Sequence, residues 1–311
     1  MPNQFKPPMG PGPRFGPPDG EMPLFPELDV SFVKRKYLDV PYASISPAQK
    51  LDLFLPAEGE GPFPVLVQIH GGGFEMGDKR DAHLEPFLEG IKHGLAVATL
   101  NYRLSSEAAF PAAVEDVKAA VRWLRANQEK YYLDGKRIAA CGGSAGGNLA
   151  AMLGTTGQTR EFDNPALGNI DQSSSVQAVV DWFGPVDFYE MDAQLAASGF
   201  SREEFHSGEQ SPETRYLGAT VREVPELAQK ANPATYIHPN VPPFLIQHGL
   251  DDFLVPCQQS VEFARLLANA SSKENVTLEL IKDAGHGDPK FETKENMEKV
   301  FQFLLNALKL P

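Results

Sequence analysis

Six short apolar runs, most of them followed by a helical pattern, constrain the fold of this chain more than any other feature. Continuous runs of Val, Ile, Leu and Ala are typical of strands buried on both faces of a parallel sheet. The runs are Val65 to His70, Ala96 to Asn101, Ile138 to Cys141, Val176 to Phe183, Phe244 to His248 and Leu278 to Ile281. Helical spacing is found at Val114, Val117, Val121 and Leu124, and again at Met297, Val300, Leu304 and Leu308. This alternation predicts a doubly wound α/β domain whose function lies on the loops after the strands.

Segments outside these runs complete the predicted organisation. Phe32 to Val40 and Lys50 to Leu55 have the pattern of two hairpin strands, which brings the predicted sheet to eight mostly parallel strands with helices on both faces. The first 26 residues contain nine prolines and four glycines, so residues 1–30 are expected to form a tail outside the domain of residues 31–311. Residues 187–236 mix acidic helical patches with Gly and Pro breaks and are expected to form a small helical, lid-like insertion.

Composition excludes several classes of function. The 311 residues carry a formal charge of -13, which repels nucleic acid and anionic lipid surfaces. We therefore expect neither as a partner, and no apolar stretch is long enough to span a bilayer. The two cysteines, Cys141 and Cys257, have no metal-binding or redox spacing and are expected to be free thiols. No metal or cofactor is expected; the compartment and the oligomeric state stay open.

The run Gly142-Gly143-Ser144-Ala145-Gly146-Gly147 follows one predicted strand and precedes a helical segment. This context is typical of a nucleophile elbow, a sharp turn that exposes a serine at the end of a strand. Small neighbours are needed because strand and helix approach closely there. A phosphate-binding loop is the alternative, but no lysine follows the glycines. We therefore predict Ser144 as a nucleophile.

A second glycine run, His70-Gly71-Gly72-Gly73-Phe74, also follows a predicted strand. Consecutive glycines let backbone N–H groups point at one substrate oxygen, as in the HGGG-type oxyanion motif. The alternative is a flexible turn. His70 is expected to orient this loop rather than to act as a base.

Two further loops supply candidate partners for the serine. Asp252 and His286 each follow a predicted strand, and the order Ser144, Asp252, His286 is the order of an α/β-hydrolase triad. Asp251 competes with Asp252, because spacing alone does not separate adjacent carboxylates. His248 is expected to stabilise the acid's loop. The remaining histidines lie in polar or turn-rich segments and are expected at the surface: His83, His93, His206 and His238.

These motifs together resemble the α/β-hydrolase superfamily, and in particular the esterases similar to hormone-sensitive lipase, over roughly Phe32 to Leu310. In that family the motif H-G-x-x-D-x-x-V-P carries the acid at its fifth residue, here Asp252. The resemblance also implies oxyanion donors from the N–H groups of Gly72, Gly73 and Ala145. It further implies a scaffold role for Asn101 to Leu104, Phe110 to Ala112 and Glu115 to Val117.

One position departs from the lipase-like pattern, because Gly143 stands where that group has Asp before the serine. The elbow and the segment Asp181 to Asp187 look more like bacterial carboxylesterases of the feruloyl and acetylxylan esterase type. A similar elbow occurs in prolyl-oligopeptidase-type peptidases, but the chain before the core is too short for their propeller.

The resemblance implies a serine carboxylesterase that hydrolyses short-chain acyl or aromatic, feruloyl-type esters through an acyl-enzyme. Phe74, Trp182 and Phe183 are expected in the substrate pocket, although core packing is an equal alternative for Trp182 and Phe183. Two other functions stay open: a serine peptidase or amidase for small substrates, and a hydrolase-fold binding protein without turnover.

Overall fold

The computed structural model describes residues 27–200 and 204–310, so nearly all of the predicted tail at 1–30 lies outside the described residues. Its centre is a sheet of eight strands: β1 (Arg35–Pro41), β2 (Lys50–Leu55), β3 (Phe63–Ile69), β4 (Ala96–Leu100), β5 (Leu133–Gly143), β6 (Ala178–Trp182), β7 (Phe244–Gly249) and β8 (Val276–Ile281). Their order in the sheet is β1-β2-β4-β3-β5-β6-β7-β8. The pairs β1–β2 and β2–β4 are antiparallel, and all other pairs are parallel. The predicted mostly parallel sheet of eight strands is confirmed.

The starts of two strands differ most from the prediction, for physical reasons. β1 begins at Arg35 rather than at Phe32, because Val33 turns inward to pack with Val30 and Phe54. β5 begins five residues before Ile138, within a polar stretch that apolar patterning does not detect.

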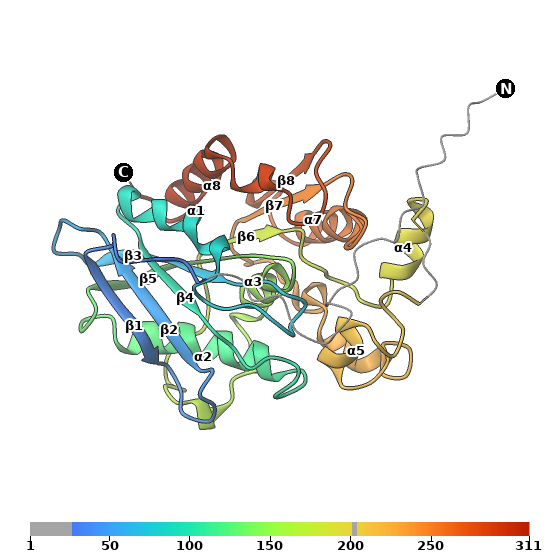
Figure 1. Cartoon of the computed structure of the whole chain (residues 1–311), viewed down its shortest axis with the longest axis horizontal. Coiled ribbons are helices and arrows are strands. Elements are labelled where there is room, and N and C mark those ends of the chain that lie inside the picture. The colour runs from blue at the N-terminus through green and yellow to red at the C-terminus, as the bar shows by residue number, and fades with distance from the viewer. Residues whose placement is uncertain (1–26, 201–203, 311) are drawn as a thin grey trace.

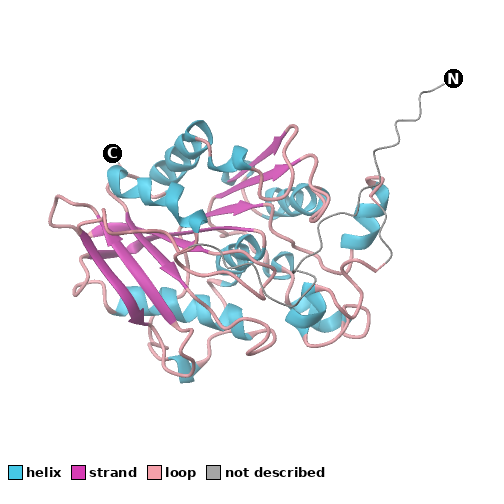
Figure 2. Ribbon diagram, in the orientation of Figure 1, coloured by secondary structure: helices cyan, strands magenta, loops and turns pink. Residues whose placement is uncertain are grey.

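Helices cover both faces of the sheet (Figures 1 and 2). Successive side chains of a strand point to opposite faces of the sheet, and both faces of β3 are apolar. Val65 and Val67 belong to one core cluster, and Leu66 belongs to another. The first cluster includes residues of α2 (Ala112–Ala126), α3 (Ala145–Thr156) and α7 (Gln258–Ala270), and the second includes residues of α1 (Glu85–Leu88) and α8 (Lys294–Ala307). The structure therefore has the α/β-hydrolase fold that the sequence predicts.

The segment between β6 and β7 contains the remaining α-helices of the described residues, α4 (Met191–Ala197), α5 (Pro212–Leu217) and α6 (Pro225–Lys230), and the 3-10 helix η4 (Pro233–Tyr236). Figure 1 shows α4 and α5 at the end of the molecule opposite β1. Short 3-10 helices elsewhere are η1 (Ala82–Leu84), η2 (Glu89–His93), η3 (Pro165–Leu167), η5 (Lys273–Asn275) and η6 (Pro289–Glu292).

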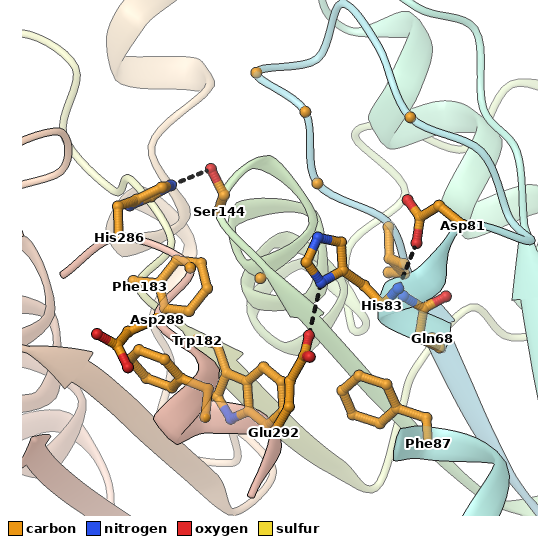
Figure 3. Close-up of a pocket in the computed structure, with 18 of the residues that line it drawn as sticks. Gln68, Asp81, His83, Phe87, Ser144, Trp182, Phe183, His286, Asp288 and Glu292 are labelled. Atoms are coloured by element: carbon orange, nitrogen blue, oxygen red, sulfur yellow. Dashed lines mark hydrogen bonds and ion pairs between the residues drawn. The ribbon is translucent and has the colours of Figure 1, made fainter. Parts of the chain in front are cut away.

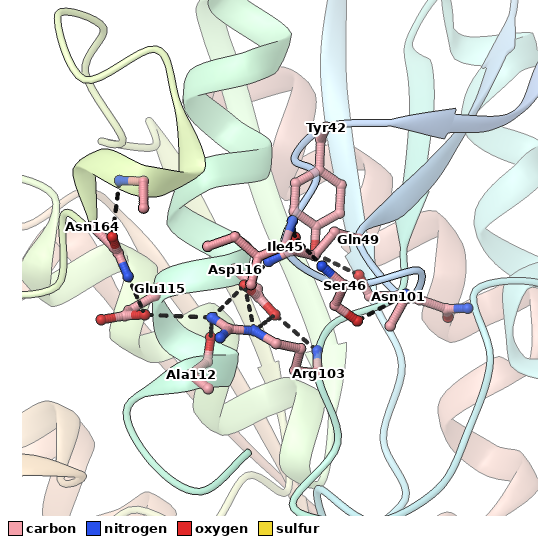
Figure 4. Close-up of polar contacts among 12 residues, drawn as sticks. Tyr42, Ile45, Ser46, Gln49, Asn101, Arg103, Ala112, Glu115, Asp116 and Asn164 are labelled. Carbon is pink, nitrogen blue, oxygen red and sulfur yellow. Dashed lines mark hydrogen bonds and ion pairs between the residues drawn. The ribbon is translucent and has the colours of Figure 1, made fainter. Parts of the chain in front are cut away.

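A network of polar contacts supports the loop after β4 (Figure 4). The guanidinium of Arg103 donates to both carboxylate oxygens of Asp116, which lies on α2 with its side chain fully buried. Gln49 donates to the same carboxylate at 2.7 Å, and Glu115 accepts from Asn164 at 3.0 Å. These contacts join the turn before β2, the loop after β4 and α2, which fits the scaffold role expected for these segments.

Both cysteines are free, as expected, with Cys141 buried in β5. In the ranges that the structure describes, no helix has the length and apolar character needed to cross a membrane.

Candidate active site

The turn between β5 and α3 forces Ser144 into an unusual conformation, with φ of 56° and ψ of -125°. A Cβ added at Gly146 would lie 2.1 Å from the carbonyl oxygen of Ile69, and one at Gly142 would lie 2.4 Å from the backbone of Gly146. Neither position has room for a side chain, because β3, β5 and α3 approach closely at this turn. The glycines therefore allow the strained turn that presents the hydroxyl of Ser144.

A side chain from one distant loop contacts Ser144, and a side chain from a second loop contacts the first. Nε2 of His286 lies 2.9 Å from Oγ of Ser144, and Nδ1 of His286 lies 2.7 Å from Oδ2 of Asp252. Because the carboxylate only accepts, Nδ1 carries the proton and Nε2 is left to accept from the serine hydroxyl. Asp252, rather than the exposed Asp251, is the carboxylate bonded to His286. The structure thus brings together the three residues predicted as a triad.

The carboxylate of Asp252 is fully buried and surrounded by donors. Its Oδ1 accepts from the backbone N–H groups of Leu254 and Val255, at 2.9 and 2.8 Å. Burial by itself raises the pKa of Asp252, but the charge of His286 and the hydrogen bonds from His248 and His286 outweigh it and hold this pKa well below its usual range. Asp252 is therefore ionised and accepts from Nδ1–H of His286.

The predicted oxyanion loop adjoins the serine. Gly72 and Gly73 have positive φ values of 103° and 60°, and both line the same pocket as Ser144. Within 27–200 and 204–310, no backbone hydrogen bond uses either of their N–H groups. Ala145 is the first residue of α3, where the helix dipole favours negative charge. His70 is buried, stacks on Tyr102 and contacts the carbonyl of Gly71, so it supports this loop as expected.

A cavity of about 180 Å³ opens beside Ser144 (Figure 3). Trp182 and Phe183 are among its apolar walls, as predicted, together with Met76, Phe87 and Phe291. The prediction that Phe74 lies in the substrate pocket is wrong, because Phe74 is not among the residues that line this cavity. Its backbone has φ of 63°, and its ring, 2% exposed, stacks on Tyr216 at 3.8 Å in the core.

Sequence reasoning missed the polar wall of this cavity. Nδ1 of His83 lies 2.6 Å from Oε1 of Glu292, and both residues line the pocket with Asp81 and Asp288. Glu292 raises the pKa of His83 through this contact, in spite of the opposing effect of burial. His83 is exposed, as expected, but its contact joins residues 209 positions apart, which no local pattern signals.

The lid-like role of residues 187–236 stays a prediction. The insertion contributes no residue to the lining of this cavity among the residues that the structure describes. It packs instead beside the loop after β3, with Pro212 near Gly73 and Tyr216 against Phe74.

Comparison with known proteins agrees with this geometry. The family model BD-FAE matches residues 51–267, which include the elbow and Asp252. The chain belongs to the BD-FAE family. Two esterases of Mycobacterium tuberculosis, LipC and LipQ, are each 30% identical to it, over 78% and 75% of this chain. The matches cover 57% and 53% of those proteins, so the chain spans about half the length of these curated relatives.

A solved structure of similar shape supports the fold assignment. A truncated carbohydrate esterase from gut microbiota aligns with 91% of this chain and 100% of its own, with a TM-score of 0.81 and 29% identity. Its fold is therefore shared over nearly all of the described domain.

Proposed function

We propose that this protein is a serine carboxylesterase. The observation that carries the proposal is the contact of His286 with both Ser144 and Asp252, at 2.9 and 2.7 Å. In the first step the Oγ of Ser144 attacks the ester carbonyl carbon while His286 takes the hydroxyl proton. His286 then gives that proton to the departing alcohol oxygen, which leaves an acyl-enzyme. Water, deprotonated by His286, attacks the acyl-enzyme and releases the carboxylic acid and free serine.

Charge that develops on the carbonyl oxygen needs fixed donors. The N–H groups of Gly72 and Gly73 lie on the loop beside Ser144, and that of Ala145 lies at the start of α3. Donors of this kind each contribute about 10² to 10³ in rate. His286 gains a positive charge in the same step, and the buried carboxylate of Asp252 stabilises it.

The cavity favours short-chain acyl or single-ring aromatic esters. A dry apolar cavity of roughly 150 Å³ holds one benzene ring, and the cavity beside Ser144 measures about 180 Å³. Its aromatic walls, Trp182, Phe183 and Phe291, suit an acetyl group or a feruloyl-type ring better than a long acyl chain. LipC and LipQ are named esterases and the solved neighbour is named a carbohydrate esterase, which supports ester hydrolysis by this chain.

The test is hydrolysis of a 4-nitrophenyl ester series from acetate to palmitate, together with methyl ferulate and a matched 4-nitroanilide. We expect activity on short esters that Ser144→Ala abolishes and that Ser272→Ala, a change at an exposed serine, leaves intact. Activity that survives Ser144→Ala would sink the mechanism. Anilide turnover equal to ester turnover would favour an amidase, and no turnover would favour a binding protein.

A further inference from the structure

His206 is a buried histidine in the insertion between α4 and α5, although the sequence predicts it at the surface. It is 2% exposed, so that prediction is wrong. Its Nε2 lies 2.8 Å from the carbonyl oxygen of Leu254, and its Nδ1 lies 3.0 Å from Oε1 of Glu213 on α5. The polar sequence around it gives no sign of this burial. Its contacts form only when the insertion packs on residues 250–257, the loop after β7 that carries Asp252 and is called the acid loop below.

The contact with Leu254 leads directly to the triad. The peptide group between Leu254 and Val255 accepts from His206 through its carbonyl and donates to Oδ1 of Asp252 through its N–H, at 2.8 Å. Hydrogen bonds in such a chain polarise one another. Displacing this peptide would therefore change both the position and the charge environment of the catalytic carboxylate.

Both partners of the His206 ring are acceptors. A backbone carbonyl has no proton to give, and an ionised carboxylate has none, so both ring nitrogens donate only when the imidazole is protonated. Two charged groups face the His206 ring, Glu213 from α5 and Asp192 from α4. Oδ1 of Asp192 accepts from the backbone N–H of His206. The guanidinium of Arg222 contacts the neighbouring Ser207. Burial lowers the pKa of His206, but Glu213, the Leu254 carbonyl and Asp192 outweigh this effect and raise it.

The helix that holds Glu213, α5, also contacts the predicted oxyanion loop after β3. Pro212, at the start of α5, lies close to Gly73, and Tyr216 stacks on Phe74 at 3.8 Å between ring centroids. A further ring contact, Phe200 on Phe253 at 4.1 Å, joins the insertion to the acid loop. α5 and the segment carrying His206 thus connect the oxyanion loop with the loop of Asp252.

We propose that the His206–Glu213 ion pair is a positioning device for the proposed esterase reaction: protonated His206 holds the Leu254–Val255 peptide in place so that Asp252 stays aligned with His286. The inference rests on the proposed function. Loss of the His206 proton would leave the Nδ1 lone pair facing the Glu213 carboxylate, and the resulting repulsion would loosen the acid loop.

Three variants test this role: His206→Ala, Glu213→Gln, and His238→Gln as a control at a histidine on neither catalytic loop. We expect His206→Ala to lower kcat for 4-nitrophenyl acetate about 10- to 100-fold, the scale of effect that a 1 Å misplacement brings, with little change in KM. His238→Gln should match the wild type.

The pH profile separates positioning from mere support of the fold. In Glu213→Gln a neutral His206 can accept from the glutamine amide while Nε2–H still donates to Leu254. We therefore expect the wild type to lose kcat as alkaline pH removes the His206 proton, and Glu213→Gln to lack that decline. A decline of the same size and position in Glu213→Gln would overturn the proposal, as would wild-type kcat in His206→Ala.

A second measurement distinguishes this failure from failure of the proposed function. The Nδ1–H proton of His286 can be followed by NMR in all variants, whether or not the protein turns over an ester. His206→Ala should broaden or shift that resonance, and His238→Gln should not. An unchanged resonance would overturn the positioning role, whereas activity that survives Ser144→Ala would overturn the esterase mechanism alone.

Discussion

The Nε2 atom of His248 lies 3.2 Å from Oδ2 of Asp252, the same carboxylate oxygen that His286 contacts at 2.7 Å. Nδ1 of His248 lies 2.7 Å from Oγ of Ser260, and the side chain is fully buried. Asp252 is therefore held by a second histidine and by two backbone N–H groups as well as by its contact with His286. The orientation of the carboxylate is fixed before any substrate binds, which is the condition for aligning a catalytic imidazole.

The first prediction concerns the choice between the two adjacent aspartates. Asp252→Asn removes the charge that fixes the His286 tautomer and should lower kcat by about 10⁴. Asp251→Asn changes an exposed neighbour and should leave kcat within about twofold, a change of under 0.5 kcal/mol. Steady-state kinetics on 4-nitrophenyl acetate measures both, and the reverse ranking would move the catalytic acid to Asp251.

The second prediction concerns the scaffold. Arg103→Ala leaves the buried carboxylate of Asp116 without its cation and should lower the free energy of unfolding by about 3–5 kcal/mol. Arg265→Ala breaks an exposed, solvent-screened pair with Glu262 and should leave the free energy of unfolding nearly unchanged. Urea denaturation followed by circular dichroism compares the two, and equal losses would show that the Arg103 network has no special weight.

The sequence predicts most of the fold, and it predicts the contacts among Ser144, His286 and Asp252, because these features have clear signals in the chain. Buried strands appear as apolar runs, and the elbow needs glycines at fixed offsets from Ser144 since no Cβ fits at Gly142 or Gly146. Asp252 and His286 are predicted because they follow strands in a set order, and the motif of the resembling family separates Asp252 from Asp251. Each of these features is visible within a few residues of the chain.

The remaining parts of the site depend on contacts between distant segments. His83 meets Glu292 across 209 positions, and His206 meets Leu254 across 48. Polar surroundings in sequence predicted both histidines at the surface, but tertiary packing buries His206 and makes His83 part of the pocket wall. The prediction that Phe74 lines the pocket is wrong for a related reason. Its ring packs in the core against Tyr216, which lies far away in sequence, in the insertion.

The third prediction follows from the charges around the cavity. Asp81, Asp288 and Glu292 line it, whereas no lysine or arginine is found among its described lining residues. A carboxylate on the substrate should therefore be disfavoured, and 4-nitrophenyl hemisuccinate should react more slowly than 4-nitrophenyl levulinate, which has a similar shape without the charge.

Removing one of these charges should reduce that discrimination. Asp288→Asn should lower the ratio of kcat/KM for the neutral over the anionic ester by about tenfold, since one charge acting at an effective dielectric near 20 contributes on the order of 1–2 kcal/mol. Glu298→Gln on the exposed face of α8 is the control and should leave the ratio unchanged. Equal ratios in all three proteins would exclude an electrostatic effect of the pocket.

The fourth prediction concerns Asp181, a fully buried carboxyl on β6 whose Oδ2 has no partner among the described residues. Burial raises its pKa to about 6, partly offset by the charge of His248 and the N–H of Gly184. An acid with a raised folded pKa stabilises the fold below its unfolded pKa and loses that stability as pH rises to the folded value. Between pH 4 and pH 7 this loss amounts to about 2 kcal/mol.

Asp181→Asn cannot ionise and should not show that loss. Urea titrations at pH 4, 5, 6, 7 and 8 should therefore find that the free energy of unfolding of the wild type falls relative to that of Asp181→Asn by about 2 kcal/mol as pH rises, with the change complete by about pH 7. Any fixed cost of the amide shifts the whole curve and leaves its slope untouched. A difference between the two proteins that is constant across this range would mean that Asp181 titrates with the same pKa in the folded and unfolded chains.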